Sequence, residues 1–420
     1  MSTPWVELEP VGAAAFARIR LRTIFEHCKW DPQVGDVAIL SPQPLALSAE
    51  SWQGVSRLAE RLAAEALAAE EELSRRPELH AQLGLPGAVR RVLRQAAGQG
   101  CTPGLARLMR FDFHFTAEGW RISEVNSDVP GGLNEASGFA RLVAEQYPGA
   151  APAGDPSGAL ADAVREAVGP SGSVAFIHAT AFTDDRQVMV YLAQRMEDRG
   201  LRCSLLAPDH LAWREGRAFS LLNGSSGPLD ALVRFFPGEW LVELSRRSAW
   251  RHFFCGARTP VCNPATAMLI QSKRFPLVWE QLRVPLPAWR ELLPPTCDPA
   301  RIAGQPPEDW VLKPAFGRVG EGVGIAGVTG EKELRKIRKT AKRHPGLWVA
   351  QRRFHAVPLA TVGGAVFPSL GIYTVGTRAV GAYARGAAKP LINSEAPDMA
   401  VLVLGTSGTR VADPSEEFGK

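Results

Sequence analysis

The chain has 420 residues, of which 45% are hydrophobic and 22% are charged, and such a composition is typical of a folded protein with a large core. Its formal net charge of +5 is small for this length and does not favour a nucleic-acid-binding protein. No segment reaches the roughly 20 apolar residues that a membrane-spanning helix requires, so we expect neither nucleic acid nor a membrane as a partner.

The cysteines and the first residues bear on the cellular compartment. The six cysteines form no C-x-x-C pair and no zinc-like cluster with the eight histidines. The first residues lack the basic region and apolar run of a secretory signal. We therefore expect a cytoplasmic location with reduced thiols.

The first hundred residues are predicted to be mainly helical. In residues 52–76, apolar and alanine residues recur at helical spacing with charged residues between them. A further helix is expected over residues 88–97. These helices are interpreted as packing elements without chemistry of their own.

A β-hairpin is predicted at residues 108–125, where large apolar residues alternate with polar ones. Residues two apart on a strand face the same side, so Arg110 and Asp112 point together. Glu124 and Asn126 do the same on the second strand, and pairing of the strands can bring all four into one patch. Carboxylate and amide oxygens suit Mg²⁺, and an arginine can hold a phosphoryl group. The alternative interpretation is a solvated hairpin face with an ordinary salt bridge.

A stretch rich in proline, glycine and alanine at residues 148–158 is predicted to break the chain. Beyond it, strands are expected at residues 173–179, 202–206 and 229–236, with a helix at 186–199 between the first two. This order of elements indicates a small parallel α/β unit.

A glycine-rich loop follows the strand that is predicted at residues 310–313. The strand ends in Lys313, and the loop contains Gly317, Gly320 and Gly322. Backbone N–H groups in such a loop can approach phosphate oxygens because glycine has no Cβ. The G-K-[ST] ending of a Walker A loop is absent, and a glycine-rich hairpin turn is the alternative interpretation.

Three other polar residues would each be interpreted as structural if taken alone. Lys273 precedes the glycine-rich loop, Gln351 ends a predicted strand where a nucleotide base could be hydrogen-bonded, and Arg385 lies on a further strand. A basic helix is expected at residues 331–343. It is interpreted as a solvated face, with a binding patch as the alternative.

Taken together, these segments resemble the glutathionylspermidine synthase family of ATP-grasp ligases over nearly the whole chain. The matching stretches are RFDFHFTAEGWRISEVNSDVPGG, DDRQVMVYLAQRMEDRGL, LDALVRFFPGEWL, CNPATAMLIQSKRFPLVWE, VLKPAFGRVGEGVGI and GAYARGAAKPLIN. The expected metal ligands precede the lysines, an order that is circularly permuted compared with most ATP-grasp enzymes. The resemblance implies a mixed α/β ATP-grasp fold and the use of ATP and Mg²⁺.

The resemblance also implies roles for particular residues. The magnesium ligands of the family match Asp112, Glu124 and Asn126. Its ATP-binding residues match Lys273, Lys313, Gly317, Gly320, Gly322 and Gln351. Its catalytic arginines match Arg110 and Arg385, and the acidic pair of its substrate pocket matches Asp184 and Asp185.

Departures from the family pattern leave the substrates open. Residues 127–132 read SDVPGG, where polyamine-conjugating members place hydroxyl residues for the glutathione carboxylate. The acidic pair, Asp184 and Asp185, is aspartate instead of glutamate. Two adjacent carboxylates can hold a cationic amine, but aspartate also caps helix N-termini. Amine binding and capping are therefore both kept as interpretations of this pair.

We expect an ATP-grasp core with an inserted small parallel α/β domain and a helical N-terminal region. Residues 1–150 are expected to contain the helical region and the metal-ligand hairpin, residues 173–262 the small α/β domain, and residues 263–420 the ATP-binding part of the core.

The expected activity is ATP- and Mg²⁺-dependent formation of an amide through an acyl phosphate. The acid would be peptide- or glutathione-like, and the amine a polyamine or amino acid. Two alternatives are a non-catalytic ATP-binding regulatory protein derived from the ligase and a nucleic-acid-binding protein that uses the basic helix. The intact set of metal ligands argues against the first. The sequence gives no indication of the oligomeric state or of the particular acid and amine.

Overall fold

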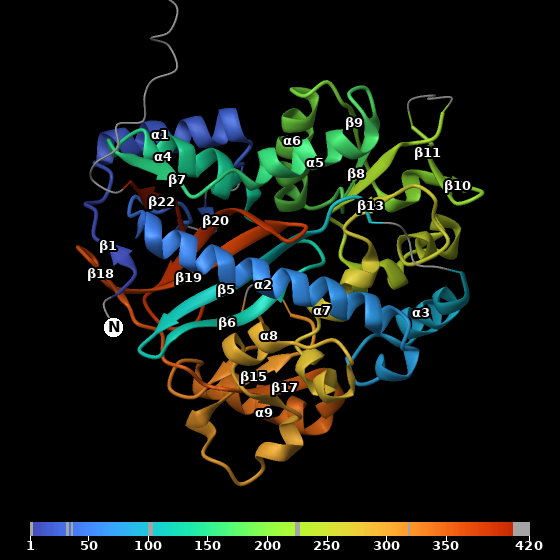
Figure 1. Ribbon diagram of the computed structural model, residues 1–420. Coiled ribbons are helices and arrows are strands. Elements are labelled where there is room, and N and C mark those ends of the chain that lie inside the picture. Colours follow the sequence, from blue (N-terminus) through green and yellow to red (C-terminus); the bar gives the residue numbers. More distant parts are fainter. Residues whose placement is uncertain are drawn as a thin grey trace, which may run out of the picture.

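The computed structural model describes residues 3–30, 33–34, 37–99, 104–222, 227–317 and 320–405 of the chain. Its central element is an antiparallel sheet with the strand order β21-β20-β19-β5-β6, in which β18 also pairs with β19 (Figure 1). The strands are β5 (Leu108–Thr116), β6 (Gly119–Asn126), β18 (Leu359–Thr361), β19 (Gly364–Val375), β20 (Arg378–Ala387) and β21 (Asp398–Met399). The predicted hairpin forms the β5–β6 edge, whereas the middle strand β19 was not predicted.

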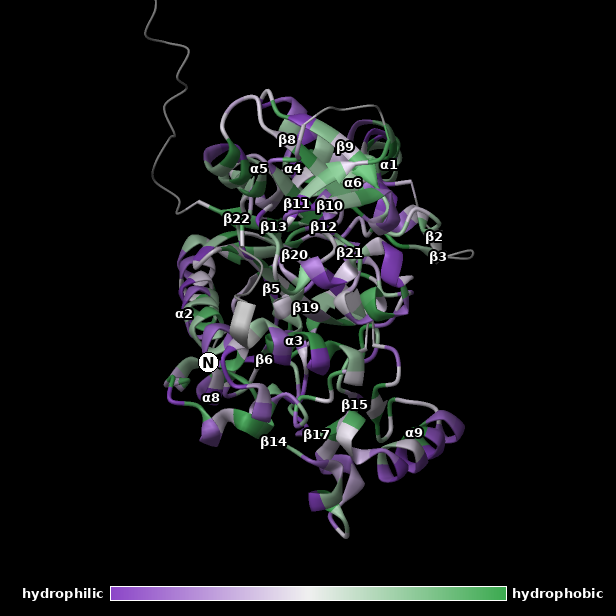
Figure 2. Ribbon diagram, turned by 90° about the vertical axis from the view of Figure 1, so that its right-hand side faces the viewer, coloured by the Kyte–Doolittle hydropathy of each residue, from purple (hydrophilic) through white to green (hydrophobic). Residues whose placement is uncertain are grey.

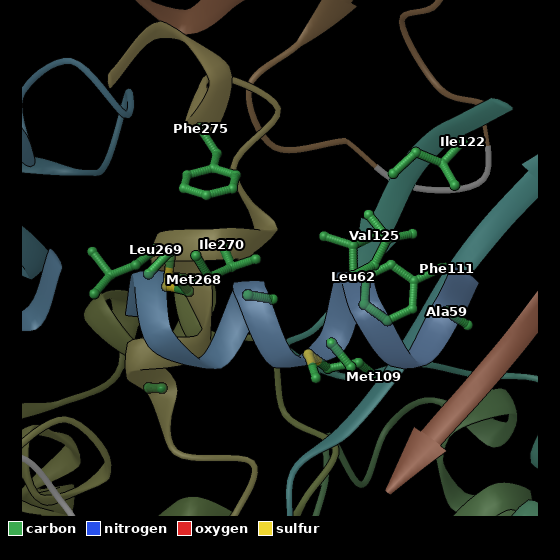
Figure 3. Close-up of a cluster of buried hydrophobic side chains, with 14 of the residues drawn as sticks. Ala59, Leu62, Met109, Phe111, Ile122, Val125, Met268, Leu269, Ile270 and Phe275 are labelled. Carbon is green, nitrogen blue, oxygen red and sulfur yellow. The ribbon is translucent and has the colours of Figure 1, made fainter. Parts of the chain in front are cut away.

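Helix α2 (Ala49–Ser74) lies across one face of this sheet and contributes to the main core. Its buried residues recur at helical spacing, as the sequence predicted. Figure 3 shows Leu62 of α2 close to Phe111 of β5. Because strand side chains alternate, Arg110 and Asp112 point to the opposite face of the sheet from Phe111.

A second sheet is parallel and has the order β13-β12-β8-β9. Its strands are β8 (Ser173–Ile177), β9 (Arg202–Leu206), β12 (Ala231–Arg234) and β13 (Val261–Cys262). Helices α5 (Pro156–Val168) and α6 (Thr183–Glu197) share one apolar cluster with it. Helix α5 was not predicted. It begins within residues 148–158, the stretch that was predicted to break the chain: Asp155 is the N-cap and Pro156 lies in the first turn.

A third, smaller antiparallel sheet with the order β14-β17-β15-β16 lies at the opposite end of the molecule from the parallel sheet (Figure 1). Its strands are β14 (Thr296–Cys297), β15 (Trp310–Pro314), β16 (Gly324–Ile325) and β17 (Trp348–Arg352). Helix α9 (Glu331–Arg343) buries Leu334, Ile337 and Ala341 against it. The basic residues of α9 are exposed, and Figure 2 shows this helix as largely hydrophilic.

Segments from both ends of the chain meet in a fourth sheet with the order β1-β4-β22-β7. Its strands are β1 (Trp5–Val6), β4 (Leu45–Ser48), β7 (Ala150–Pro152) and β22 (Val401–Leu404). Helix α4 (Ala140–Ala144) packs against this sheet, and α1 (Ala13–His27) packs against α4. The N-terminal region therefore contains strands in addition to the predicted helices.

The remaining elements are short or peripheral. They are α3 (Gly87–Gln99), α7 (Met268–Gln271), α8 (Pro287–Leu292), a π-helical turn (Glu135–Phe139), and the strands β2 (Gln33–Val34), β3 (Val37–Ala38), β10 (Leu211–Arg214) and β11 (Arg217–Ser220). Within the described ranges, no helix is both long and apolar enough to cross a lipid bilayer.

The mixed α/β class that the sequence predicted is confirmed. The large sheet combines β5 and β6 with β19 and β20, so the predicted parts 1–150 and 263–420 share one sheet. The parallel sheet lies within residues 173–262. The three domain boundaries themselves stay a prediction.

Candidate functional site

A cavity of about 660 Å³ lies between the large and the small antiparallel sheets and reaches the first turn of α6. Except for Gly322, every residue predicted to carry function lines it: Arg110, Asp112, Glu124, Asn126, Asp184, Asp185, Lys273, Lys313, Gly317, Gly320, Gln351 and Arg385. Residues that are up to 275 positions apart in the chain (110 and 385) are thus brought to one place.

The register of the β5–β6 hairpin builds one wall of the cavity. Asp112 lies opposite Glu124, and Arg110 lies opposite Asn126. Asn126 Nδ2 donates to Asp112 Oδ2 at 3.0 Å, and Arg110 Nε donates to Asp112 Oδ1 at 2.7 Å. The ordinary salt bridge of the alternative interpretation is therefore present, but the face that carries it lines a cavity instead of open solvent.

The oxygen donors of this wall fit a hard divalent cation. Asp112 and Glu124 offer carboxylates and Asn126 an amide oxygen, the ligand types that suit Mg²⁺. Over the described part of the chain, no group of three or more His, Cys, Asp or Glu side chains could hold a metal ion. The predicted set has only two carboxylates, so it leaves coordination positions for water and phosphate, as Mg²⁺ commonly requires.

The charge of Glu124 is balanced by a lysine from another part of the chain. Burial would raise the pKa of Glu124, but the ammonium groups of Lys273 and Lys313 lower it below its usual value. Lys273 Nζ lies 2.9 Å from Glu124 Oε2 and donates to the carbonyl of Gly317 at 3.2 Å. Glu124 is therefore ionised at neutral pH, and Lys273 joins the hairpin to the glycine-rich loop.

Lys313 and Gln351 come from the neighbouring strands β15 and β17. Lys313 Nζ donates to Gln351 Oε1 at 2.8 Å and to the carbonyl of Ser123 at 3.1 Å. Gln351 Nε2 donates to Thr296 Oγ1 at 3.3 Å. Burial lowers the pKa of Lys313 to about 8, and the nearby ammonium of Lys273 adds to this effect, while the carboxylates of Glu124 and Asp112 offset it only in part.

The glycine-rich loop connects β15 to β16, which are antiparallel, so the hairpin interpretation describes its topology correctly. At Gly320, where φ is +72°, an added Cβ would lie 2.2 Å from the carbonyl oxygen of Ile392. At Gly317 a Cβ would lie 2.6 Å from Pro314 Cγ. Glycine is thus required for close packing at both positions. Arg318 and Val319 of this loop lie outside the described residues.

The two predicted catalytic arginines are held by carbonyl and carboxylate oxygens. Arg110 also donates to the carbonyl of Gly131 at 2.9 Å, and its guanidinium lies 5.2 Å from the ring centre of Tyr383. Arg385 Nη2 donates to the carbonyl of Ala396 at 2.7 Å, and its Nε lies 3.3 Å from Asp398 Oδ1. Both guanidinium groups have fixed orientations at the cavity wall.

The acidic pair lies in the first turn of α6, beside the carboxyl ends of the parallel strands. The N-cap of α6 is Phe182, which makes no side-chain capping hydrogen bond, so neither aspartate occupies the capping position. Asp184, Asp185 and Glu239 all line the cavity, and the neighbouring rings of Phe182 and Trp240 lie with their centres 5.8 Å apart, so the two turns are close together. Glu239, which sequence reasoning missed, lies in the turn after β12.

Sequence reasoning also missed several polar residues that support the site. Gln271 Oε1 accepts hydrogen bonds from the backbone N–H groups of Ser127 and Asp128 at 2.7 and 3.0 Å. Asn263 Nδ2 donates to the carbonyls of Ser127 and Asp128 at 3.0 Å each. His114 lines the cavity, and burial lowers its pKa to about 4, so it is neutral. These contacts join distant segments; the three residues lie within stretches that match the family, but nothing in those stretches indicates their partners.

Comparisons with solved structures show which known proteins have a similar fold. Over 94% of the chain, the fold is similar to 98% of a glutathione synthetase-like effector from Globodera pallida, with a TM-score of 0.63 and 14% sequence identity. A proposed gamma-glutamylcysteine synthetase from Methylobacillus flagellatus aligns over 81% of this chain and 88% of its own, with a TM-score of 0.42 and 13% identity. A search of curated proteins found no match. The fold is thus shared with this glutathione synthetase-like protein, in agreement with the predicted mixed α/β class.

A match to a family model shows to which family the chain belongs. Residues 42–400 match the model described as glutathionylspermidine synthase preATP-grasp, which covers most of the chain. The chain belongs to this family, as its motifs predicted, and is a synthetase-type ligase. The roles of the individual site residues stay predictions.

Proposed function

We propose that the protein is an ATP- and Mg²⁺-dependent, ADP-forming ligase that joins a carboxylate to an amine through an acyl phosphate. The observation that carries the proposal is the single cavity that collects oxygen donors, lysines, arginines and an acidic turn. Family membership supports a small-molecule acid, peptide- or glutathione-like, and an amine such as a polyamine or an amino acid. A cytoplasmic location goes with this proposal as a prediction.

The cavity supports a division into a nucleotide end and an amine end. Lys273, Lys313 and the loop glycines would contact the phosphates, and Gln351 lies where the base would be bound. Asp112, Glu124 and Asn126 would hold Mg²⁺, which supplies charge neutralisation to the phosphates when bound. The acidic turn at Asp184, Asp185 and Glu239 offers negative charge to a cationic amine.

Two transfers complete the proposed reaction. A carboxylate oxygen of the acid attacks the γ-phosphorus of ATP, the bond to the β-phosphate oxygen breaks, and ADP leaves. The amine nitrogen then attacks the acyl carbon, phosphate leaves, and the nitrogen loses a proton as the amide forms. Arg110 and Arg385 would stabilise the negative charge of the transferring phosphoryl group from β5 and β20, the two strands that flank β19.

An ADP-release screen tests the proposal. Candidate acids are crossed with polyamines, amino acids and small peptides in the presence of Mg·ATP, and ADP formation is followed with amide formation by mass spectrometry. We expect ADP release that requires both an acid and an amine. The variant Glu124→Gln should lower the turnover number on the order of 100-fold or more, because it removes one charged metal ligand.

The matched control is Glu118→Gln, which alters an exposed carboxylate at the turn of the same hairpin. This control should keep wild-type turnover and wild-type Tm. Tight binding of Mg·ATP without ADP release for any pair of substrates would contradict the proposal and favour the non-catalytic alternative. Unchanged turnover in Glu124→Gln would contradict the metal assignment alone.

A further inference from the structure

Lys29 is a buried lysine that comes from the N-terminal region and lines the cavity. It follows α1 in a short segment, and only 4% of its surface is exposed. A buried ammonium is costly unless carboxylates or hydrogen bonds compensate it. The N-terminal region, which the sequence suggested had no chemistry of its own, therefore places a charge in the site.

Lys29 is part of a chain of alternating charges. Its Nζ lies 2.5 Å from Glu135 Oε1 and 3.8 Å from Asp398 Oδ2. The other carboxylate oxygen of Asp398, Oδ1, lies 3.3 Å from Arg385 Nε. Glu135, Lys29, Asp398 and Arg385 all line the cavity and sum to zero formal charge.

The backbone around Lys29 is tied to the elements that carry its partners. The backbone N–H of Trp30 donates to Gln187 Oε1 of α6 at 2.7 Å. Asn134 Nδ2 donates to the carbonyl of His27 at 2.7 Å. The position of Lys29 is therefore set on both sides by hydrogen bonds to other parts of the cavity wall.

The segment before β21 surrounds Arg385. Ser394 and Ala396 accept hydrogen bonds from its guanidinium through their carbonyls. Asp398, which follows them, is 5% exposed. Without Lys29, Glu135 and Asp398 would be two buried carboxylates with less positive charge between them, and their repulsion would favour another arrangement.

We propose that Lys29 is a positioning residue of the active site: it neutralises Glu135 and fixes Asp398, so that Asp398 and the 394–398 segment hold Arg385 at the cavity wall. The catalytic consequence rests on the proposed function, because it assumes that Arg385 contacts the transferring phosphoryl group. The structural consequence, the orientation of Arg385, does not depend on any assumption about the reaction.

The variant Lys29→Met, which keeps the length and removes the charge, provides the test. In its crystal structure, we expect the Arg385 guanidinium to have left Asp398 and the Ala396 carbonyl. With the acid and amine found by the ADP-release screen, the turnover number should fall about 10- to 100-fold, as expected for a displaced catalytic group. Calorimetric affinity for Mg·ATP should stay within about twofold, because Lys273 and Lys313 are held by Gly317 and Gln351, in other segments of the chain.

A second-site variant separates charge from packing. In Lys29→Met/Glu135→Gln the unbalanced carboxylate is also removed, so Arg385 should return to Asp398 and most of the turnover should return. Lys29→Arg should retain both the position of Arg385 and the turnover number. Lys332→Met removes an exposed lysine from α9 and should behave as wild type.

The outcomes distinguish this inference from the proposed function. If Arg385 keeps its place in Lys29→Met, the inference is wrong whatever the kinetics show. If the double variant restores Tm but neither the position of Arg385 nor the turnover number, Lys29 only stabilises the fold, and the inference is again wrong. If wild-type protein releases no ADP with any pair of substrates, the proposed function fails, while the crystallographic result still decides the role of Lys29.

Discussion

At the scale of single residues, the two lysines near the glycine-rich loop, Lys273 and Lys313, differ in their electrostatic surroundings. Lys273 lies beside a carboxylate, Glu124, whereas Lys313 donates to the neutral oxygens of Gln351 and Ser123. A buried ammonium with neutral acceptors loses its proton more easily than an exposed one. The charge of Lys313 should therefore depend on pH in the neutral to alkaline range.

We predict that Mg·ATP affinity falls as the pH rises through about 8, the pKa to which burial lowers Lys313. Binding to phosphate requires the protonated amine, so the decrease should approach tenfold per pH unit at most above that value. Calorimetry between pH 6.5 and about 9.5 measures this dependence. Lys313→Arg should remove it, because arginine stays protonated. An equal pH dependence in wild type and Lys313→Arg would contradict the prediction.

The same pKa shift has the opposite effect on the stability of the ligand-free protein, which increases as the pH rises. Between pH 8 and the usual lysine value of 10.5, the unfolded chain binds more protons at this position than the folded chain. Lys313 therefore lowers the free energy of unfolding below pH 8, and this destabilisation diminishes as the pH rises to 10.5.

At the scale of elements, the glycine-rich loop packs against the segment before β21. Gly320 has a left-handed conformation and would bring a Cβ to 2.2 Å from Ile392 O. We predict that Gly320→Ala lowers Mg·ATP affinity roughly 5- to 30-fold, equivalent to the 1–2 kcal/mol of a left-handed alanine. Calorimetry measures the affinity, and Tm should also fall, because the close approach to Ile392 O is present in the ligand-free structure.

The control for this prediction is Gly330→Ala at the start of α9. Gly330 has φ of −56°, and a Cβ added there would have no atom within 4 Å, so alanine fits without strain. Affinity for Mg·ATP should be unchanged in the control. Equal affinities in the two variants would show that the conformation of Gly320 is irrelevant to nucleotide binding.

The first turn of α6 allows the capping and amine-binding interpretations to be separated. We predict that Asp185→Asn raises the KM for the amine at least about tenfold, since a charged hydrogen bond contributes ~1.5–3 kcal/mol. Its Tm should stay within about 2 °C, because Phe182 and not Asp185 is the N-cap. Asp198→Asn, at the exposed C-terminal end of the same helix, is the control. A lower Tm with unchanged amine kinetics would support a helix-stabilising role instead.

At the scale of the whole molecule, one buried ion pair joins the large sheet to the parallel unit. Asp128 follows β6, Arg234 ends β12, and their side chains form a salt bridge with 2% and 0% exposure. Arg234 Nε also donates to the Asn263 carbonyl at 2.9 Å, and Asp128 Oδ2 accepts from the N–H of Gly238 at 2.8 Å. The loop after β6 is thereby fixed to the end of the parallel sheet.

We predict that Arg234→Met lowers the free energy of unfolding by about 3–5 kcal/mol, because Asp128 stays buried without its cation. Urea denaturation measures the change. Arg61→Met is the matched control, since Arg61 and Glu291 form an exposed pair with 47% and 54% exposure, and its effect should be below ~1 kcal/mol. A similar small effect for both variants would contradict the structural importance of the buried pair.

Elements with a local side-chain pattern could be predicted from the sequence. The periodicity of α2 and the alternation of β5 and β6 follow from the side chains of each segment. The clustering of Asp112 with Glu124 follows as well, because a hairpin with a short turn permits few registers. Motifs similar to those of the family identified the fold class and twelve of the residues that line the cavity.

Only the tertiary structure decided which distant segments meet. Strand β19 pairs with β5 across more than 200 residues, Arg385 receives its partners from the 394–398 segment, and Lys29 enters the cavity from the N-terminal region. Neither strand β19 nor Lys29 carries a local signal of these contacts. Pairings of this kind depend on how apolar surfaces of the whole chain are buried together, and a buried charge such as Lys29 is stable only where that packing supplies its partners.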